Sequence, residues 1–240
     1  MPSAARSVAV SLSLLAIAAC SVRDAACGRP VTREPTPDEV AIAETGTNAP
    51  ALFSIVFLGD SLTAGLGLLS DQAYPGLIRE QFAAEGYSNV EIVNAGISGD
   101  TTAGGAQRVE WLLDQDVRIL VVALGGNDAL RGLPVGETRE NLAAIIETAQ
   151  DAGVMVLLAG MEAPTNLGEE YRQAFRAAFA QLALAYPGIE YMPFLLEGVA
   201  AEPTLNQPDG IHPNEQGAAI IAENMYPRLR MMVDSLGGGG

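Results

Sequence analysis

The sequence predicts a three-layer α/β/α sandwich built on a five-stranded parallel sheet. Two observations lead to this prediction. Short apolar runs rich in β-branched residues are bounded by glycine or polar residues, as is typical of buried strands. Between them lie longer segments that alternate with the runs and read as helices. Strands that alternate with helices form a parallel sheet covered on both faces, and right-handed crossovers arrange the helices in two outer layers.

The elements can be assigned in chain order. The strands are short, mostly aliphatic segments, expected at residues 53–58, 90–95, 118–124, 154–159 and 189–192. The helices lie between and after them, at residues 74–86, 102–114, 137–152, 168–186 and 213–234. The third helix is the clearest case, because Leu142, Ile145 and Ala149 keep a helical spacing. Gly86 ends the first helix.

Composition limits the classes of function. The chain has 240 residues, of which 49% are hydrophobic and 18% charged, which suits one globular domain with a sizeable core. Its formal net charge is -16, and nucleic-acid binding requires a basic surface instead. Attraction to anionic lipid through surface charge is excluded for the same reason. Two cysteines and one histidine cannot form a zinc site of the usual kind.

The amino terminus has the features of an export signal. Residues 1–19 combine a positive start with an apolar run too short to span a membrane. The run ends in Ile17-Ala18-Ala19-Cys20, which resembles the bacterial lipobox. Cys20 would then carry a lipid and become the first mature residue, on the periplasmic face of a membrane. Alternatively, ordinary cleavage leaves Cys20 free to pair with Cys27 in a soluble periplasmic protein. Both interpretations export the protein.

Composition also marks the domain boundaries. Residues 20–50 contain four prolines and little periodicity, so we expect a flexible tether. The folded domain is expected at 51–236. The closing glycines, 237–240, predict a disordered tail.

A serine follows the first expected strand, in Gly59-Asp60-Ser61-Leu62. In open α/β sheets this edge is where ligands bind, so Ser61 is a candidate nucleophile. A serine hydroxyl needs a base, and the chain offers His212 as its one histidine and contains no lysine. A lone histidine is also compatible with a surface or capping residue. Asp209, three residues before it, can accept the ring N–H and leave the other nitrogen for the serine proton.

Two further strand ends carry small and polar residues. These are residues 94–100, after the second strand, and residues 125–128, after the third. Each segment alone is compatible with a turn. Together they emerge at the edge that holds Ser61, where backbone N–H groups and the amide of Asn127 could stabilise a tetrahedral oxyanion.

These segments resemble the conserved blocks of the SGNH (GDSL) hydrolase family. The matching residues lie in order within about 53–232: Gly59-Asp60-Ser61-Leu62, Gly99, Gly125-Gly126-Asn127-Asp128, and Asp209 with His212. The resemblance implies a flavodoxin-like fold, Ser61 as nucleophile, and an oxyanion hole from the Ser61 and Gly99 N–H groups and the Asn127 side chain. The residues in and around these motifs are most similar to those of an exported bacterial subgroup whose members act as thioesterase, arylesterase and lysophospholipase. A small acyl ester is the implied substrate, with no cofactor.

Several details around these blocks carry their own expectations. Leu62-Thr63 follows Ser61, so the sharp nucleophile elbow of α/β-hydrolases is not indicated. Glu162 stands where the subgroup places part of its acyl pocket and could alter the preferred chain length. The loop 129–134 covers the substrate or is a plain connection. Three aspartates beside the blocks are expected to bond loop N–H groups: Asp60, Asp100 and Asp128.

The sequence is also compatible with three alternatives. A carbohydrate or cell-wall O-acetyl esterase would share the same site. A non-catalytic binding lipoprotein would be expected to lack Ser61, Asn127 or His212, and all three are present. A flavodoxin would need a hydroxyl-rich phosphate loop after the first strand, which this segment matches poorly.

Overall fold

The computed structural model describes residues 52–114 and 116–237. The predicted leader, Cys20, Cys27 and the tether lie outside these residues, as do the last three glycines of the predicted tail. None of the helices in the described part of the chain is long and apolar enough to cross a membrane.

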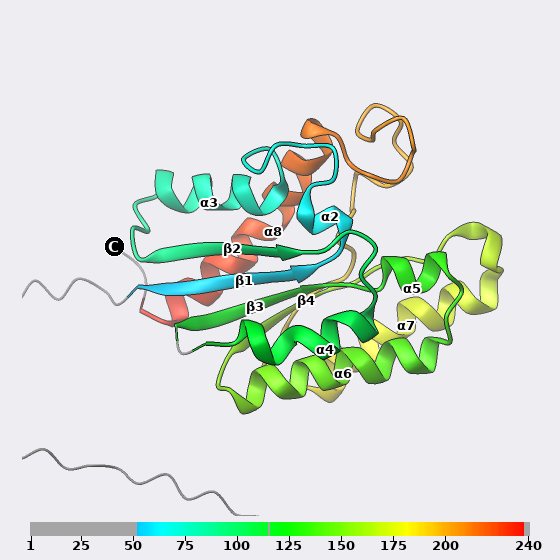
Figure 1. Cartoon of the computed structure of the whole chain (residues 1–240), viewed down its shortest axis with the longest axis horizontal. Helices are drawn as coiled ribbons and strands as arrows, with labels where there is room; N and C mark the ends of the chain where they lie inside the picture. The colour runs from blue at the N-terminus through cyan, green and yellow to red at the C-terminus, as the bar shows by residue number, and fades with distance from the viewer. Residues whose placement is uncertain (1–51, 115, 238–240) are drawn as a thin grey trace, which may run out of the picture. The chain divides into compact units, whose positions relative to one another are not determined.

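A parallel sheet of five strands forms the centre of the domain (Figure 1). Its order is β2-β1-β3-β4-β5, and every neighbouring pair is parallel. The strands span β1 (Phe53–Gly59), β2 (Val90–Gly96), β3 (Val117–Ala123), β4 (Met155–Ala159) and β5 (Glu190–Met192). Each predicted strand is confirmed to within about one residue. The carboxyl ends of β1, β2 and β3 therefore meet at one edge of the sheet.

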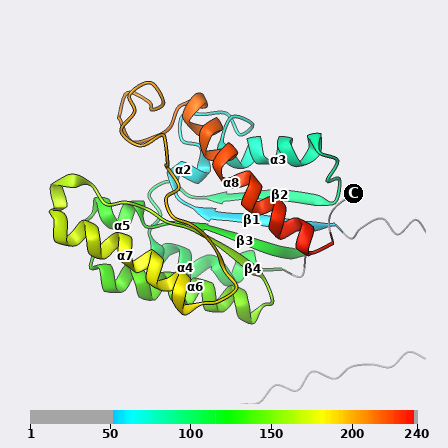
Figure 2. The same ribbon diagram turned by 180° about the vertical axis from the view of Figure 1, so that it is seen from behind.

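Helices cover both faces of this sheet, as Figures 1 and 2 show from opposite sides. One layer contains α3 (Tyr74–Ala84) and α8 (Glu215–Ser235), which pack against each other. The other contains α4 (Thr102–Leu112), α6 (Val135–Asp151) and α7 (Glu169–Ala185), with α6 between its neighbours. The predicted three-layer α/β/α arrangement is thereby confirmed.

The interior strands carry most of the core. All seven residues of β1 are buried, and β3 is buried except at Arg118. Continuous apolar runs are what a parallel strand needs when helices cover both of its faces. β2 lies at the edge of the sheet, and its residues are half-buried or exposed. The sheet is thus a rigid support for the loops at its carboxyl edge.

Three short elements differ from the prediction, which had turns or loops in their place. They are α2 (Ser61–Ala64), α5 (Gly126–Leu130) and the 3₁₀ helix η1 (Thr165–Leu167). Elements of one turn show no hydrophobic periodicity, so the pattern could not reveal them. The last helix also begins at Glu215 instead of the predicted residue 213. The Asn214 side chain caps it by accepting from the N–H groups of Gln216 and Gly217.

Candidate active site

Ser61 is the first residue of α2, directly after β1. Asp60 caps this helix by accepting from the Leu62 N–H at 3.0 Å, which turns the chain sharply at the strand end. Gly59 makes that turn possible, because a Cβ atom there would lie 1.9 Å from Thr63 Oγ1. The local sequence therefore holds the Ser61 side chain at the edge of the sheet.

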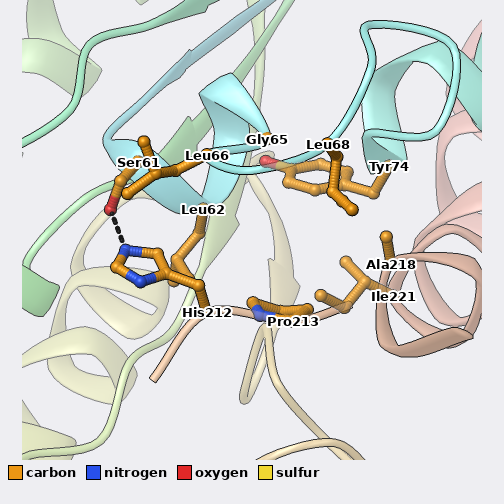
Figure 3. A pocket seen from close by; sticks show the side chains of 10 residues that line it. All are labelled: Ser61, Leu62, Gly65, Leu66, Leu68, Tyr74, His212, Pro213, Ala218 and Ile221. Carbon is orange, nitrogen blue, oxygen red and sulfur yellow. Dashed lines mark hydrogen bonds between the residues drawn. The ribbon is translucent and has the colours of Figure 1, made fainter. Parts of the chain in front are cut away.

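His212 approaches Ser61 from the loop before α8. Its Nε2 lies 2.8 Å from Ser61 Oγ, and its Nδ1 lies 2.7 Å from Asp209 Oδ2. An ionised carboxylate only accepts hydrogen bonds, so Nδ1 carries the ring hydrogen and Nε2 is free to accept from the serine hydroxyl. The sequence predicted that these three side chains would lie together, and the structure brings them together in that order. Figure 3 shows the bond between Ser61 and His212.

Asp209 is held in its ionised form. The backbone N–H groups of His212 and Ile211 donate to its Oδ1 at 3.0 and 2.9 Å. These two bonds, together with the bond from the His212 ring, lower the pKa of the Asp209 carboxyl from 3.8 to about 2. The loop therefore presents a permanent negative charge to the imidazole at neutral pH.

Asn127 comes from the neighbouring strand end, after β3, as the second residue of α5. The preceding Gly125 has a φ of 114°, a conformation that favours glycine, and it forms the N-cap of this short helix. The amide Nδ2 of Asn127 donates to Asp60 Oδ2 at 3.1 Å. An amide nitrogen carries two hydrogens, so this bond occupies one and the other can serve a ligand in the cavity that Asn127 lines.

Asp60 is almost fully buried beneath these groups, with 2% of its surface exposed. Burial raises the pKa of its carboxyl from 3.8 to about 6, against the opposing effect of the bonds from Leu62 and Asn127. The sequence predicted that Asp60 bonds a loop N–H; the N–H that it accepts from belongs to Leu62, in the first turn of α2. The contact with Asn127 was missed, because nothing in the sequence pairs residues 67 positions apart.

Gly99 also lines the cavity, from the loop after β2, and has a φ of 82°. Its carbonyl accepts from Arg131 Nη2 at 2.7 Å, which ties this loop to the end of α5. Next to it, Asp100 accepts from the Thr101 N–H at 3.1 Å and from Arg108 Nε at 2.8 Å. Arg108 also donates to the carbonyl of Gly59, so one guanidinium braces two of the strand ends.

Asp128 connects the helices behind this edge. It is buried, and it accepts from the backbone N–H of Thr102 at 2.9 Å as well as from the hydroxyl of the same residue. The hydroxyl of Thr138 in α6 also donates to it. Asp60, Asp100 and Asp128 were expected to bond loop N–H groups, and all three accept from a backbone N–H. The donors, however, are at helix starts: Leu62 in α2, Thr101 at the N-cap of α4 and Thr102 as its first residue.

The candidate residues open onto one cavity of about 710 Å³. Ser61, Gly99, Asn127 and His212 all line it. Its apolar lining comes from segments far apart in the sequence, including Leu66, Leu130, Met161, Phe194, Leu196 and Ile211. No sequence signal marked most of these positions, because single apolar residues in loops have no periodicity. In the segment 129–134, expected either to cover the substrate or to be a plain connection, Leu130 ends α5 and forms part of the cavity wall.

Glu162 also lines the cavity, in the segment predicted to form part of an acyl pocket. Its carboxylate lies 2.8 Å from Arg176 Nη2, a contact the sequence did not indicate. The charge beside the cavity is therefore balanced by a cation. Behind Ser61 and His212 lies a second space of only about 10 Å³ (Figure 3). It has room for about one water molecule and none for a substrate.

Among residues 52–114 and 116–237, no group of three or more histidine, cysteine, aspartate or glutamate side chains is arranged to hold a metal ion. A candidate nucleophile, Ser61, and a candidate base, His212, line a largely apolar cavity together with Asn127, and Asp209 holds the His212 ring. Such a site is suited to acyl transfer.

Comparison with known families decides the assignment. Residues 57–220 match the model of the GDSL-like lipase/acylhydrolase family. The chain belongs to this family. As a GDSL-family protein it is a serine hydrolase of ester bonds, which replaces the interpretations as a binding lipoprotein or a flavodoxin.

Relatives of this GDSL hydrolase support the same assignment. It is 38% identical over 188 residues to the esterase TesA of Pseudomonas aeruginosa, a match that covers 78% of this chain and 92% of the relative. It is 36% identical over 187 residues to the thioesterase 1/protease 1/lysophospholipase L1 of Escherichia coli, covering 78% and 88%. The solved structure of the esterase EstA from Pseudoalteromonas, inhibited by monoethylphosphonate, matches with a TM-score of 0.70 at 32% identity, over 75% of this chain and 98% of EstA.

Proposed function

We propose that the enzyme hydrolyses short to medium acyl or aryl esters through an acyl-enzyme on Ser61. The observation that carries the proposal is the continuous line of hydrogen bonds from Ser61 Oγ through the His212 ring to Asp209, at 2.8 and 2.7 Å. This line ends at a cavity of about 710 Å³, a size typical of sites for small ligands, which range over about 300–1,000 Å³.

The reaction follows from these positions. His212 Nε2 takes the hydroxyl proton as Ser61 Oγ attacks the ester carbonyl, and the imidazolium then gives that proton to the leaving alkoxide or phenoxide. The ionised Asp209 stabilises the imidazolium and keeps its ring in place. A water molecule then attacks the acyl-enzyme, giving its proton to His212, and the acid product leaves as Ser61 regains the proton.

The negative charge of the tetrahedral intermediate needs donors on the other side. The proposed donors are the backbone N–H groups of Ser61 and Gly99 and the side-chain amide of Asn127. All three residues line the cavity. Donors fixed before the reaction stabilise the transition state most, because they need no rearrangement when the charge develops.

The lining favours apolar acyl groups over sugars. Leucine, methionine and phenylalanine side chains form much of the wall, and Arg176 balances the carboxylate of Glu162. Since one relative is named a thioesterase and lysophospholipase, thioesters and lysophospholipids belong in the substrate panel. An acetylated saccharide in the same panel tests the O-acetyl esterase alternative.

A direct test compares p-nitrophenyl acetate and octanoate with the wild-type enzyme and Ser61→Ala. We expect hydrolysis of both esters and a loss of about 10⁶-fold in kcat in the variant, as in other triad enzymes. An organophosphonate should add mass to the peptide that contains Ser61. Labelling of another residue with full loss of activity would refute the nucleophile.

The proposal includes export. The apolar run before Ile17-Ala18-Ala19-Cys20 supports a signal peptide over residues 1–19 and a lipid on Cys20, which would anchor the enzyme to the periplasmic face of a membrane. Mass spectrometry of the mature amino terminus distinguishes the outcomes. A diacylglyceryl mass on Cys20 supports the lipoprotein, whereas a disulfide between Cys20 and Cys27 means a soluble periplasmic enzyme.

A further inference from the structure

Ser61 and His212 are 151 residues apart and belong to different segments (Figure 3). Ser61 begins the segment that continues through Leu66, whereas His212 precedes Pro213 and α8. A hydrogen bond of 2.8 Å between two such side chains is short enough for proton transfer only if the two backbones keep their spacing. Some other contact between the segments must therefore fix that spacing.

The side chain of Gln207 forms such a contact. Its Nε2 donates to the carbonyl oxygen of Leu66 at 2.6 Å and to the carbonyl oxygen of Pro213 at 3.0 Å. Both hydrogens of one amide nitrogen are thus used, one on each segment. Because a backbone carbonyl oxygen moves only with its peptide group, these two bonds fix the position of the main chain in both segments.

The bond to Leu66 is transmitted directly to the nucleophile. The N–H of Leu66 donates to the carbonyl of Ser61 at 3.0 Å, and so does the N–H of Gly65, which caps α2 in the left-handed conformation. Leu66 and Ser61 therefore belong to one hydrogen-bonded turn. A shift of the Leu66 carbonyl would displace that turn and the Ser61 side chain with it.

The connection to His212 is equally short. The backbone N–H of Gln207 donates to the carbonyl of His212 at 2.7 Å, and its own carbonyl accepts from Gly210 at 2.9 Å. The neighbouring Asn206 and Pro213 form an antiparallel bridge. The loop that carries His212 is thereby closed on Gln207 from both of its ends.

The facing segment leaves room for this amide at Gly67. A Cβ atom at that position would lie 2.4 Å from Gln207 Oε1, and the φ of Gly67 is 82°, which also favours glycine. The close approach of the two segments thus depends on a missing side chain on one of them and an amide on the other.

We propose that Gln207 is a positioning residue that sets the spacing between Ser61 and His212. The inference rests on the proposed catalytic roles of those two residues. Gln207 does not touch the reacting atoms, and it acts through the backbones of both segments. Asp209 and His212 lie on the same loop and move together, so their mutual bond does not depend on Gln207.

Gln207→Met tests the proposal, because methionine keeps the length and loses both donors. Misplacing reacting groups by about 1 Å costs about 10²-fold in rate, so we expect kcat to fall about 10–100-fold with KM nearly unchanged. Phosphonate inactivation of Ser61 should slow by the same factor, and the pH profile should keep its shape. Rates are expressed per site titrated by the phosphonate, which removes any unfolded fraction.

The matched control is Gln72→Met. Gln72 follows the segment of Ser61 and Leu66 in the chain and does not line the cavity. Its Nε2 donates to Glu215 Oε1 of α8 at 2.8 Å, and its Oε1 accepts from the Leu69 N–H at 2.9 Å. It should lose thermal stability at most, with kcat within about twofold of the wild type. A similar loss of kcat in both variants would mean that the segment needs general stability, and it would overturn the positioning role.

One further variant keeps the test decisive. Gly67→Ala presses on the same amide from the other side and should reproduce the loss of kcat if Gln207→Met fails to fold. An unchanged kcat per titrated site in either folded variant refutes the proposal. Failure of the proposed function is a separate result, since Ser61→Ala would then retain activity whatever Gln207 does.

Discussion

The amide of Asn127 donates to the carboxylate of Asp60 at 3.1 Å, and Asp60 is the residue that directly precedes Ser61. One carboxylate thus caps the helix of the candidate nucleophile and holds the candidate oxyanion donor. This contact joins the ends of β1 and β3, which are neighbours in the sheet. Asp60 therefore links the two halves of the site.

Asp60→Asn should lower kcat while it raises the stability of the fold at neutral pH. The new amide can accept from the Leu62 N–H through its oxygen, but its nitrogen then faces the nitrogen of the Asn127 amide, and that bond is lost. We expect kcat to fall, but by less than the loss of about 10²–10³-fold that follows removal of an oxyanion donor. KM should change little, since Asp60 lines the cavity with only 2% of its surface exposed. A kcat equal to that of the wild type would show that Asn127 holds its position without Asp60.

The same variant should change the pH dependence of stability. The pKa of Asp60 is about 6 in the folded protein against an ordinary value of 3.8. The raised pKa contributes stability that is fully present below pH 3.8 and is lost as the pH rises through about 6. Ionised Asp60 therefore destabilises the fold at neutral pH by up to about 3 kcal/mol, from the 1.36 kcal/mol that accompanies each pH unit.

Chemical denaturation at several pH values measures this effect. Relative to the wild type, Asp60→Asn should gain stability at pH 7.5 and lose that advantage near pH 4. A constant difference in the free energy of unfolding across this range would contradict the raised pKa. The control is Asp71→Asn, which changes an exposed carboxylate. Asp128→Asn is unsuitable as a control, because the buried Asp128 has several hydrogen-bond partners.

Asp209→Asn tests the acid behind the imidazole. The pKa of Asp209 is about 2, so it is ionised at every pH at which an esterase assay is practical. The amide leaves the loop geometry nearly intact but cannot stabilise the imidazolium, and in a serine protease triad the corresponding change costs about 10⁴-fold in kcat. Steady-state kinetics at neutral pH checks this. Near-full activity would make the pair of Ser61 and His212 sufficient.

How far the sequence predicts this molecule depends on the length of each feature. Four strands and the five longer helices were predicted because each contains enough residues to show a period of two or of 3.6, or a continuous buried run. The fifth strand, β5, was also predicted, although its three residues show no such period. The helices α2 and α5 were not, since four or five residues are held by caps such as Asp60 and by glycine conformations such as that of Gly125. Their residues nevertheless stood out as small and polar at strand ends.

Contacts between distant segments are even harder to predict from the sequence. The segments containing Ser61 and His212 could be placed together because their chemistry is complementary. Gln207 has no such mark: it is one glutamine in a loop, and its partners are backbone carbonyls, one of them 141 residues away. Backbone acceptors are identical at every position, so no residue type in the sequence indicates which of them will be used.

The pair of Glu162 and Arg176 predicts an effect on acyl preference. Arg176→Ala would leave an unpaired carboxylate beside the apolar lining and disfavour longer acyl chains. Arg176 is more than half exposed, and exposed ion pairs contribute about 0.2–1 kcal/mol, so the ratio of kcat/KM for octanoate over acetate should fall by less than about sixfold. Arg139→Ala, on α6 against Gln181, is the matched control. Adding Glu162→Gln to Arg176→Ala should restore the ratio.

Asn127→Ala separates the mechanism proposed here from a plain serine triad. The amide should bond the developing oxyanion more strongly than the substrate carbonyl, so its loss acts on kcat more than on KM. Removing one such donor costs about 10²–10³-fold in kcat, or roughly 2.7–4 kcal/mol. Because Ser61 and His212 remain, the variant should still react with a phosphonate, only slowly.

Asn127→Asp provides the sharper comparison, since a carboxylate at this position faces both the oxyanion and the buried Asp60. It should be slower than Asn127→Ala and, at neutral pH, less stable, because two carboxylates would share the position of the present hydrogen bond. If Asn127 only shaped the turn after Gly125, the melting temperature would drop while kcat per phosphonate-titrated site stayed constant. Melting temperature and kcat measured on the same samples of both variants therefore decide between the two roles.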